Sequence, residues 1–175
     1  MTQLLMRRPD LLDIPGAAPL PEGYVLRLAG GAEDVRPLAS TLSAAFGEPW
    51  DEERVRNSLT ETPDVRAVYV VAWDGRPVAT ASSRLVPERF PGSGYVHWVG
   101  THPEHAGKGL ASALVARVLW DFAERGCEDA VLETDDFWLP AVRTYLKFGF
   151  LPVYGVSGED HGQRWSQVLQ RVFGR

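Results

Sequence analysis

The sequence predicts an α/β (α+β) fold with a central mixed sheet flanked by helices. The dipeptide Asp74-Gly75 separates two strand-like apolar runs, a pattern typical of an antiparallel hairpin. Further along, a segment with helical periodicity joins strands expected over residues 95–101 and 130–134, and such a crossover makes those two strands parallel. Because both antiparallel and parallel pairing are expected, the sheet is mixed. The length of 175 residues indicates one domain, residues 1–175.

The elements before the hairpin follow from side-chain periodicity. Residues 24–28 alternate apolar and charged side chains and predict a first strand. Residues 32–46 place apolar side chains on one helical face, and Glu33 and Asp34 favour the start of that helix because its N-terminus carries a partial positive charge. After a Gly-Glu-Pro break, a second helix is expected over residues 51–60.

The middle of the chain holds the hairpin and the crossover helix. The hairpin strands are expected over residues 65–73 and 76–86, and the loop over 87–94 lies where a substrate-contacting loop is common. The crossover helix ends at Gly126, a favoured C-terminal residue. Its predicted buried stripe consists of Leu110, Leu114, Val118 and Phe122.

The remaining elements complete the expected core, residues 24–154. A short helix begins near Pro140 and ends at Gly149, and a strand follows over residues 150–154. An amphipathic helix is expected over residues 160–172. Within the N-terminal extension, residues 1–23, the segment 3–8 could supply a strand to this molecule or to a partner.

Composition limits which partners the protein can bind and where in the cell it is expected. The chain has 18 basic and 23 acidic side chains, and no stripe of Lys and Arg, so we expect no nucleic-acid partner. No apolar run approaches the ~20 residues that span a bilayer, and the first residues lack the core of a signal peptide, so no membrane association is expected. The lone Cys127 fits a cytoplasmic protein, as a small linker residue or as a nucleophile without a nearby base.

A glycine-bearing loop follows the strand expected over residues 95–101. Gly107 and Gly109 lie between this strand and the start of the crossover helix, where free backbone N–H groups and the helix dipole can bind phosphate. The loop could also be an ordinary turn before a helix. It does not fit the P-loop pattern, because Gly109 follows Lys108. It fits the dinucleotide fingerprint only partly, because Ser112 occupies the place of the third glycine.

A second motif decides among these interpretations. Residues 132–150 have the pattern of a strand, a loop, a short helix and a Gly-Phe exit. Together the two motifs resemble the GCN5-related N-acetyltransferase (GNAT) family, whose acetyl-CoA loop is R/Q-x-x-G-x-G/A and whose next motif is N-x-x-A-x-x-x-Y-x-x-x-G-F. The matching positions are Gly109, Ala111, Ala141, Tyr145, Gly149 and Phe150.

The resemblance implies a GNAT-like acyl-CoA N-acyltransferase fold with acetyl-CoA as cosubstrate. Two positions depart from the pattern: Ala106 replaces the usual Arg or Gln, and Trp138 replaces the usual Asn. The first leaves the backbone donors to hold the pyrophosphate, and the second removes a polar contact near the cofactor arm. The resemblance places these residues at the cofactor: Val99, Gly100, Thr101, Ala106, Gly107, Lys108, Gly109, Leu110, Ala111 and Trp138. It also implies a bulge in the strand before the loop that frees the backbone of Val99, Gly100 and Thr101 for the thioester and pantetheine arm, although no residue pattern marks this bulge.

The resemblance also suggests the groups that move protons. Tyr145 aligns with a family tyrosine assigned as general acid to the leaving thiolate; otherwise it is a packed core aromatic. Glu133 lies twelve residues earlier, the spacing of the base in some relatives, although a charged strand residue can simply face solvent. His97 is the rival base, expected on one strand face with Val99 and Thr101, or it is a histidine satisfied by hydrogen bonds.

Other polar residues are open to two interpretations. His102 and His105 are three residues apart but straddle Pro103 in a turn, so no metal site is expected. Asp135 and Asp136 follow a strand at its C-terminal end, where they could attract an ammonium group or cap the next helix.

The sequence therefore predicts an N-acetyltransferase that moves an acetyl group from acetyl-CoA to a primary amine of a small molecule or peptide. Direct transfer in a ternary complex is expected, because no activated nucleophile is evident. The alternatives are a non-catalytic acyl-CoA-binding or sensing domain and a Rossmann-type nucleotide-binding module. A homodimer is expected from the amphipathic C-terminal segment and the apolar run Leu4-Leu5-Met6.

Overall fold

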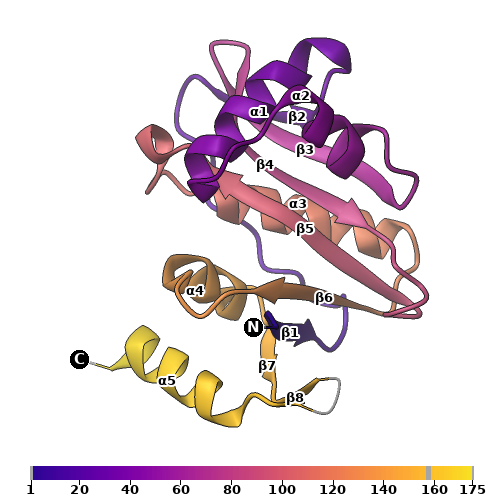
Figure 1. Ribbon diagram of the computed structural model, residues 1–175. Helices are drawn as coiled ribbons and strands as arrows, with labels where there is room; N and C mark the ends of the chain where they lie inside the picture. The colour runs from indigo at the N-terminus through magenta and orange to yellow at the C-terminus, as the bar shows by residue number, and fades with distance from the viewer. Residues whose placement is uncertain (1, 157–158, 175) are drawn as a thin grey trace.

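A seven-stranded mixed sheet lies at the centre of the molecule (Figure 1). The computed structural model describes residues 2–156 and 159–174. The strand order is β2-β3-β4-β5-β6-β1-β7, and only β5 and β6 are parallel. The strands are β1 (Leu4–Arg8), β2 (Tyr24–Leu28), β3 (Val65–Trp73), β4 (Arg76–Arg84), β5 (Ser93–Thr101), β6 (Asp129–Thr134), β7 (Leu151–Val153) and, in a separate small hairpin, β8 (Gly155–Val156) and β9 (Glu159–Asp160).

Helices cover both faces of this sheet. The predicted second helix is an α-helical turn that continues as a π-helix, and Asp51 caps its start by accepting a hydrogen bond from the Arg54 backbone at 2.7 Å. The helices are α1 (Ala32–Phe46), α2 (Glu52–Val55), η1 (Arg56–Thr60), the 3₁₀ turn η2 (Pro103–His105), α3 (Leu110–Glu124), α4 (Leu139–Lys147) and α5 (Gly162–Phe173).

The expected fold class and the expected core elements are confirmed, with shifts at the boundaries. Strand β5 begins at Ser93 rather than at residue 95, because Ser93 and Gly94 pair with Asp129 and Ala130 of β6. Strand β4 ends at Arg84 rather than at residue 86. Pairing partners that are distant in sequence decide both ends, so local periodicity could not place them.

Residues 4–8 supply a strand to this same molecule. Strand β1 lies between β6 and β7 and is antiparallel to both. Leu4 and Met6 point into the core under α3, whereas Leu5 packs with Tyr95 and Val131 on the other face. The N-terminal extension thus forms an inner strand of the sheet, which buries the apolar run on both sides.

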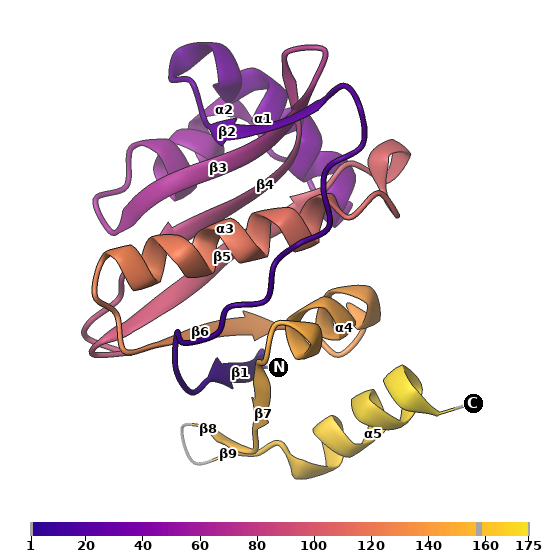
Figure 2. The same ribbon diagram turned by 180° about the vertical axis from the view of Figure 1, so that it is seen from behind.

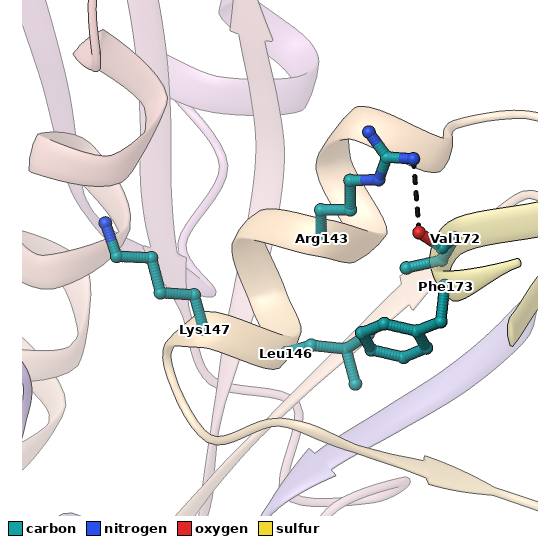
Figure 3. Close-up of a pocket in the computed structure, with 5 residues that line it drawn as sticks. All are labelled: Arg143, Leu146, Lys147, Val172 and Phe173. Carbon is teal, nitrogen blue, oxygen red and sulfur yellow. Dashed lines mark hydrogen bonds between the residues drawn. The ribbon is translucent and has the colours of Figure 1, made fainter. Parts of the chain in front are cut away.

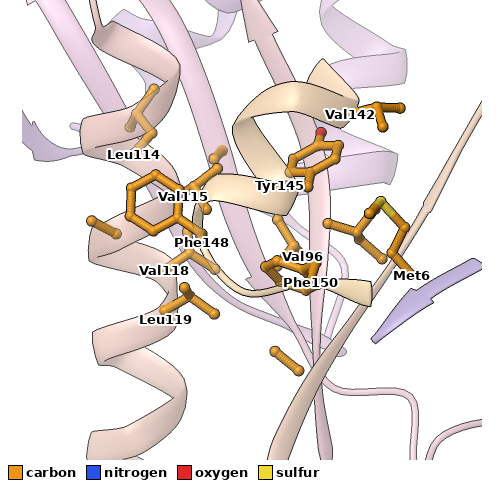
Figure 4. Packing of buried hydrophobic residues seen from close by; sticks show 14 of the residues in the cluster. Met6, Val96, Leu114, Val115, Val118, Leu119, Val142, Tyr145, Phe148 and Phe150 are labelled. Atoms are coloured by element: carbon orange, nitrogen blue, oxygen red, sulfur yellow. The ribbon is translucent and has the colours of Figure 1, made fainter. Parts of the chain in front are cut away.

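The larger core lies between the sheet and α3, which crosses in front of the strands in the view of Figure 2. All four residues of the predicted stripe, Leu110 to Phe122, are almost fully buried there. Helix α4 adds Val142 and Tyr145 to the same core, and Phe148 follows directly after the helix (Figure 4). A separate core on the opposite face joins α1 and α2 to β3.

A buried carboxylate links α3 to the sheet. Asp121 accepts hydrogen bonds from the Tyr69 hydroxyl at 2.9 Å and the Ser83 hydroxyl at 2.6 Å, and it pairs with Arg125 at 2.6 Å. Burial alone raises the pKa of a carboxyl group, but these hydrogen bonds outweigh burial and hold the pKa of Asp121 below its usual range. The charged network fixes α3, whose other end begins beside the glycine loop.

The C-terminal helix folds back onto α4. Trp165, Val168 and Val172 of α5 are buried in the main core, and Arg143 donates to the Val172 carbonyl at 3.1 Å. The two segments that suggested a homodimer, residues 4–6 and α5, therefore bury their apolar faces within this chain. That reason for expecting a homodimer no longer holds, and dimerisation stays a prediction.

Candidate active site

The two parallel strands of the sheet separate after a short pairing. β5 and β6 are in register only at Ser93–Asp129, Gly94–Ala130 and Tyr95–Val131. Beyond these pairs the two strands diverge, and the gap between their ribbons widens toward α4 (Figure 1). The edge of β5 that faces β6 therefore has no sheet partner from Val96 onward, and its backbone groups remain free to bind a ligand.

A β-bulge reshapes β5 within this open stretch. On β4, Thr80 opposes Gly100 but Ser82 opposes His97, so β5 carries one extra residue. Trp98 has a φ of 47°, in the left-handed region that costs a bulky residue about 1–3 kcal/mol. Its indole packs against Phe46 and Trp50, with ring centroids 5.3 and 4.7 Å away.

The bulge corrects the expected orientation of His97. His97 and Trp98 both face the α1 side, with Tyr95, whereas Val99 packs into the core under α3. The expectation that His97 shares a face with Val99 is wrong, because strict alternation fails where an extra residue is inserted. The bulge begins two residues before Val99, the first residue that the sequence placed at the cofactor arm.

The glycine loop after β5 fits an anion. Gly107 and Gly109 have φ values of 75° and 77°, which favour glycine, and their surroundings are open. Helix α3 begins with no side-chain cap, so its first backbone N–H groups are available to a ligand. Ala106 and Lys108 are exposed in this loop, whereas the Leu110 side chain is buried in the core and offers only its backbone.

The two histidines beside this loop are tied to other groups. His105 Nδ1 lies 2.7 Å from the Tyr24 hydroxyl, and its ring also contacts Trp73. His102 Nδ1 accepts a hydrogen bond from the Glu104 backbone N–H at 3.3 Å, and the rings of His102 and His105 are 6.0 Å apart. Within residues 2–156 and 159–174, no three His, Cys, Asp or Glu side chains are arranged to hold a metal ion.

Tyr145 lies on the α3 side of the open edge. Its ring is buried and makes an edge contact with Phe150, with centroids 6.0 Å apart. The hydroxyl lies on the side of the ring away from Phe150 (Figure 4). Burial alone raises the pKa of this hydroxyl, with no hydrogen bond contributing, so Tyr145 keeps its proton at neutral pH.

Glu133 lies on the opposite face, at the end of β6. It forms an ion pair with Arg89 at 2.7 Å and accepts a hydrogen bond from the Tyr95 hydroxyl at 2.7 Å. A second, longer contact joins Arg89 to the other carboxylate oxygen at 3.3 Å. A carboxylate has about four acceptor positions, so roughly one remains for a substrate.

His97 is held between two residues of β4. Its Nε2 accepts a weak contact from Arg84 at 3.4 Å, and its Nδ1 lies 3.4 Å from the Ser82 hydroxyl. Burial, with the Arg84 charge as a smaller cause, lowers the pKa of His97 to about 3. The imidazole is therefore neutral at neutral pH, but it is a weak base.

The loop between β6 and α4 is anchored by the two ends of the chain. Asp136 pairs with Arg164 of α5, which holds the pKa of this carboxyl below its usual range, and Gln3 donates to Asp135 at 3.2 Å. Helix α4 has no side-chain cap, so neither aspartate caps it. Trp138, expected near the cofactor arm, has its ring 5.9 Å from that of Phe46.

Two surface cavities lie away from the open edge. One, of about 380 Å³, is between α4 and α5 and is lined by Arg143, Leu146, Lys147, Val172 and Phe173 (Figure 3). The other, of about 260 Å³, includes Cys127 and lies at the far end of α3. Burial raises the pKa of the Cys127 thiol, so it is poorly suited to act as a nucleophile.

Sequence reasoning missed two residues of this site. Tyr95 and Arg89 both hold Glu133, and neither was a candidate. Tyr95 lies two residues before His97, the spacing of one strand face, which could have indicated it. Arg89 belongs to the loop over residues 87–94, whose folded shape no local pattern specifies.

Comparisons with known proteins identify the family. The model of the acetyltransferase (GNAT) family matches residues 35–150. The chain belongs to this family. It is 31% identical over 157 residues to a mycothiol acetyltransferase of Actinosynnema mirum, covering 85% of this chain and 51% of that protein.

Solved structures show the same fold at lower identity. A GCN5-related N-acetyltransferase from Sphaerobacter thermophilus matches with a TM-score of 0.67 and 23% identity, over 87% of this chain and 50% of that one. The NatC complex bound to a Gag peptide and CoA matches with a TM-score of 0.62 and 20% identity, over 73% of this chain and 84% of that one.

The match to curated relatives is partial in length. The chain spans between 51% and 59% of the lengths of an actinobacterial mycothiol acetyltransferase and a rat N-acetyltransferase 8F1. In the part of the chain that the structure describes, no helix is long and apolar enough to cross a bilayer. The cytoplasmic location stays a prediction.

Proposed function

We propose that the chain transfers an acetyl group from acetyl-CoA to a primary amine, directly and in a ternary complex. The observation that carries the proposal is the open edge of β5, which the glycine loop adjoins and which lies between Tyr145 on one face and Glu133 on the other. Membership of the GNAT family and a fold neighbour that holds CoA support the cosubstrate.

The chain offers a place for each part of the cosubstrate. The first N–H groups of α3 and the loop around Gly107 and Gly109 would bind the pyrophosphate. The edge of β5 that faces β6, which has no strand partner from Val99 to Thr101, would bind the pantetheine arm and the thioester carbonyl. Acetyl-CoA supplies the acetyl group already activated as a thioester.

Protons move on opposite faces of the sheet in this proposal. The amine nitrogen forms a bond to the acetyl carbon as the carbon–sulfur bond breaks. The remaining acceptor position of Glu133 takes the first proton from the ammonium, directly or through water, and the second nitrogen proton leaves to water as the amide forms. The Tyr145 hydroxyl gives its proton to the sulfur and regains one from water. Tyr95 and Arg89 are positioning residues, because they orient the Glu133 carboxylate.

A substitution in the glycine loop tests the cosubstrate. We expect acetyl-CoA to raise the melting temperature of the protein by mass action and Gly109→Glu to abolish that shift, because it adds a negative charge at the pyrophosphate. Gly126→Glu is the matched control, since Gly126 also has a positive φ, 76°, and open surroundings, at the other end of α3. An undiminished shift in Gly109→Glu would place the cosubstrate elsewhere.

Activity separates this enzyme from a non-catalytic binding domain. Release of free CoA thiol from acetyl-CoA is measured with and without a panel of primary amines. Amine-dependent release above the rate of hydrolysis supports transfer. Binding of acetyl-CoA without such release would favour the acyl-CoA-binding alternative.

A further inference from the structure

Aromatic rings form a continuous row on the α1 face of the open edge. Trp50 and Phe46 both contact Trp98, at centroid distances of 4.7 and 5.3 Å. Phe46 also contacts Trp138 at 5.9 Å. Trp98, Phe46 and Trp138 are each only partly buried, so their rings remain accessible, unlike those of the main core.

This row bridges the two halves of the divided sheet. Trp98 belongs to β5, whereas Trp138 follows β6 and begins α4. The end of α1 lies directly on β5, because a Cβ at Gly100 would come within 3.2 Å of both Ala45 and Phe46. Phe46 therefore reaches from the β5 side to the α4 side, across the stretch where the strands are unpaired.

The carboxylates around this row already have partners. Glu133 is paired with Arg89, Asp64 with Arg84 at 2.6 Å, and Asp136 with Arg164. Asp135 accepts from Gln3. Of this set, Glu133 is the carboxylate that contacts Tyr95 directly. The Arg54 guanidinium already lies 4.0 Å from the centroid of the Trp50 ring and 5.8 Å from that of Trp98, so a second cation of a substrate would meet a like charge there.

We propose that the acceptor is a primary amine on an apolar, preferably aromatic, carbon body without a second cationic group. The body packs against Trp98, Phe46 and Trp138, and its ammonium group faces Glu133. This inference rests on the proposed function and specifies its substrate class. A polyamine would bring a second ammonium group toward Arg54, which already lies over the Trp50 and Trp98 rings, and toward carboxylates that are already paired. That group would lose hydration without gaining an ion pair.

Three probe amines test the inference at saturating acetyl-CoA: 2-phenylethylamine, ethylamine and spermidine. We expect kcat/KM for 2-phenylethylamine to exceed that for each of the other two by about tenfold or more, the scale of a few apolar groups in a pocket. Trp138→Ala should lower the ratio of 2-phenylethylamine to ethylamine by about tenfold. Trp120→Ala, which removes an exposed tryptophan from α3, is the matched control and should leave that ratio unchanged.

The outcomes separate the substrate class from the activity itself. The inference is overturned if acetyl-CoA binds but spermidine or ethylamine is acetylated as efficiently as 2-phenylethylamine. It is also overturned if 2-phenylethylamine is not acetylated at all. In both cases the proposed function still holds if another primary amine is acetylated. A Trp138→Ala ratio equal to that of the wild type, with an unchanged melting temperature, also overturns it. Absence of acetyl-CoA binding, measured by calorimetry, overturns both the inference and the proposed function.

Discussion

The two faces of the sheet at the open edge use their polar groups differently. On the α3 face, Tyr145 belongs to the apolar core, and burial is the one cause that raises the pKa of its hydroxyl. On the α1 face, Glu133 and His97 each contact neighbouring polar side chains. A neutral phenol can thus be buried without a charged partner. A buried carboxylate, by contrast, requires hydrogen bonds or an ion pair to remain charged.

This contrast assigns the two faces to different steps. A neutral phenol with a raised pKa is ready to protonate a thiolate but not to accept a proton from an ammonium. The charged Glu133 carboxylate is suited to the second task. Its partners fix its direction, and Tyr95 stays protonated because burial and the Glu133 charge raise the pKa of its hydroxyl.

The largest expected effect lies on the α3 face. Tyr145→Phe keeps the ring that packs against Phe150 and removes only the hydroxyl, so kcat should fall by ~10²-fold or more, the usual scale for a general acid, while acetyl-CoA affinity changes little. Steady-state kinetics and calorimetry measure the two quantities. Tyr154→Phe is the matched control, because that tyrosine is exposed. Near-normal turnover in Tyr145→Phe would make Tyr145 a core aromatic without a catalytic role.

A smaller effect is expected on the α1 face. Glu133→Gln keeps the shape of the side chain and the contact with Tyr95 but removes the charge, so kcat/KM should fall by ~10²-fold, the lower end for a general base, and its acidic limb should disappear. The pH profile of kcat/KM is the measurement. Glu159→Gln, at an exposed carboxylate in the small hairpin, is a control for removing one negative charge. A Glu133→Gln profile with the wild-type limb would show that another group is the base.

Local patterns in the sequence specify the α3 face better than the α1 face. The stripe from Leu110 to Phe122 and the glycine loop were predicted, because helix periodicity and glycines in a turn are patterns of residues that are close in sequence. The bulge was expected only from the family resemblance, at Val99 to Thr101, and no residue pattern indicated the strained Trp98, whose backbone is compensated by rings from α1 and from the chain before α2. No local signal in a strand marks such a compensation.

The position of the N-terminal strand within the sheet could not be predicted from local sequence either. The run Leu4-Leu5-Met6 was recognised as a possible strand, but a short apolar run can pair with any free edge. Its position between β6 and β7 depends on contacts with residues more than 120 positions away, such as Leu4 with Thr134 and Leu5 with Val153. The partners of Glu133 depend on tertiary structure for the same reason.

The smallest effect on activity is expected at His97, on the α1 face. Its lowered pKa instead makes the free energy of unfolding depend on pH. The pKa of His97 is lowered from 6.5 to about 3, so as pH falls below 6.5 the unfolded chain binds a proton that the folded protein does not. The stability that neutral His97 contributes is therefore complete above pH 6.5 and is lost as pH falls toward 3. At pH 5 the loss amounts to about 2 kcal/mol at most.

His97→Gln removes this titration while keeping a polar side chain beside Ser82 and Arg84. Urea unfolding at pH 7 and at pH 5 should show a smaller drop in the free energy of unfolding for the variant than for the wild type. The acidic limb of kcat/KM should remain in His97→Gln, because a group with a pKa of about 3 does not titrate in the range where the enzyme is assayed. Equal drops in stability would mean that His97 titrates normally, and loss of the limb would make His97, rather than Glu133, the base.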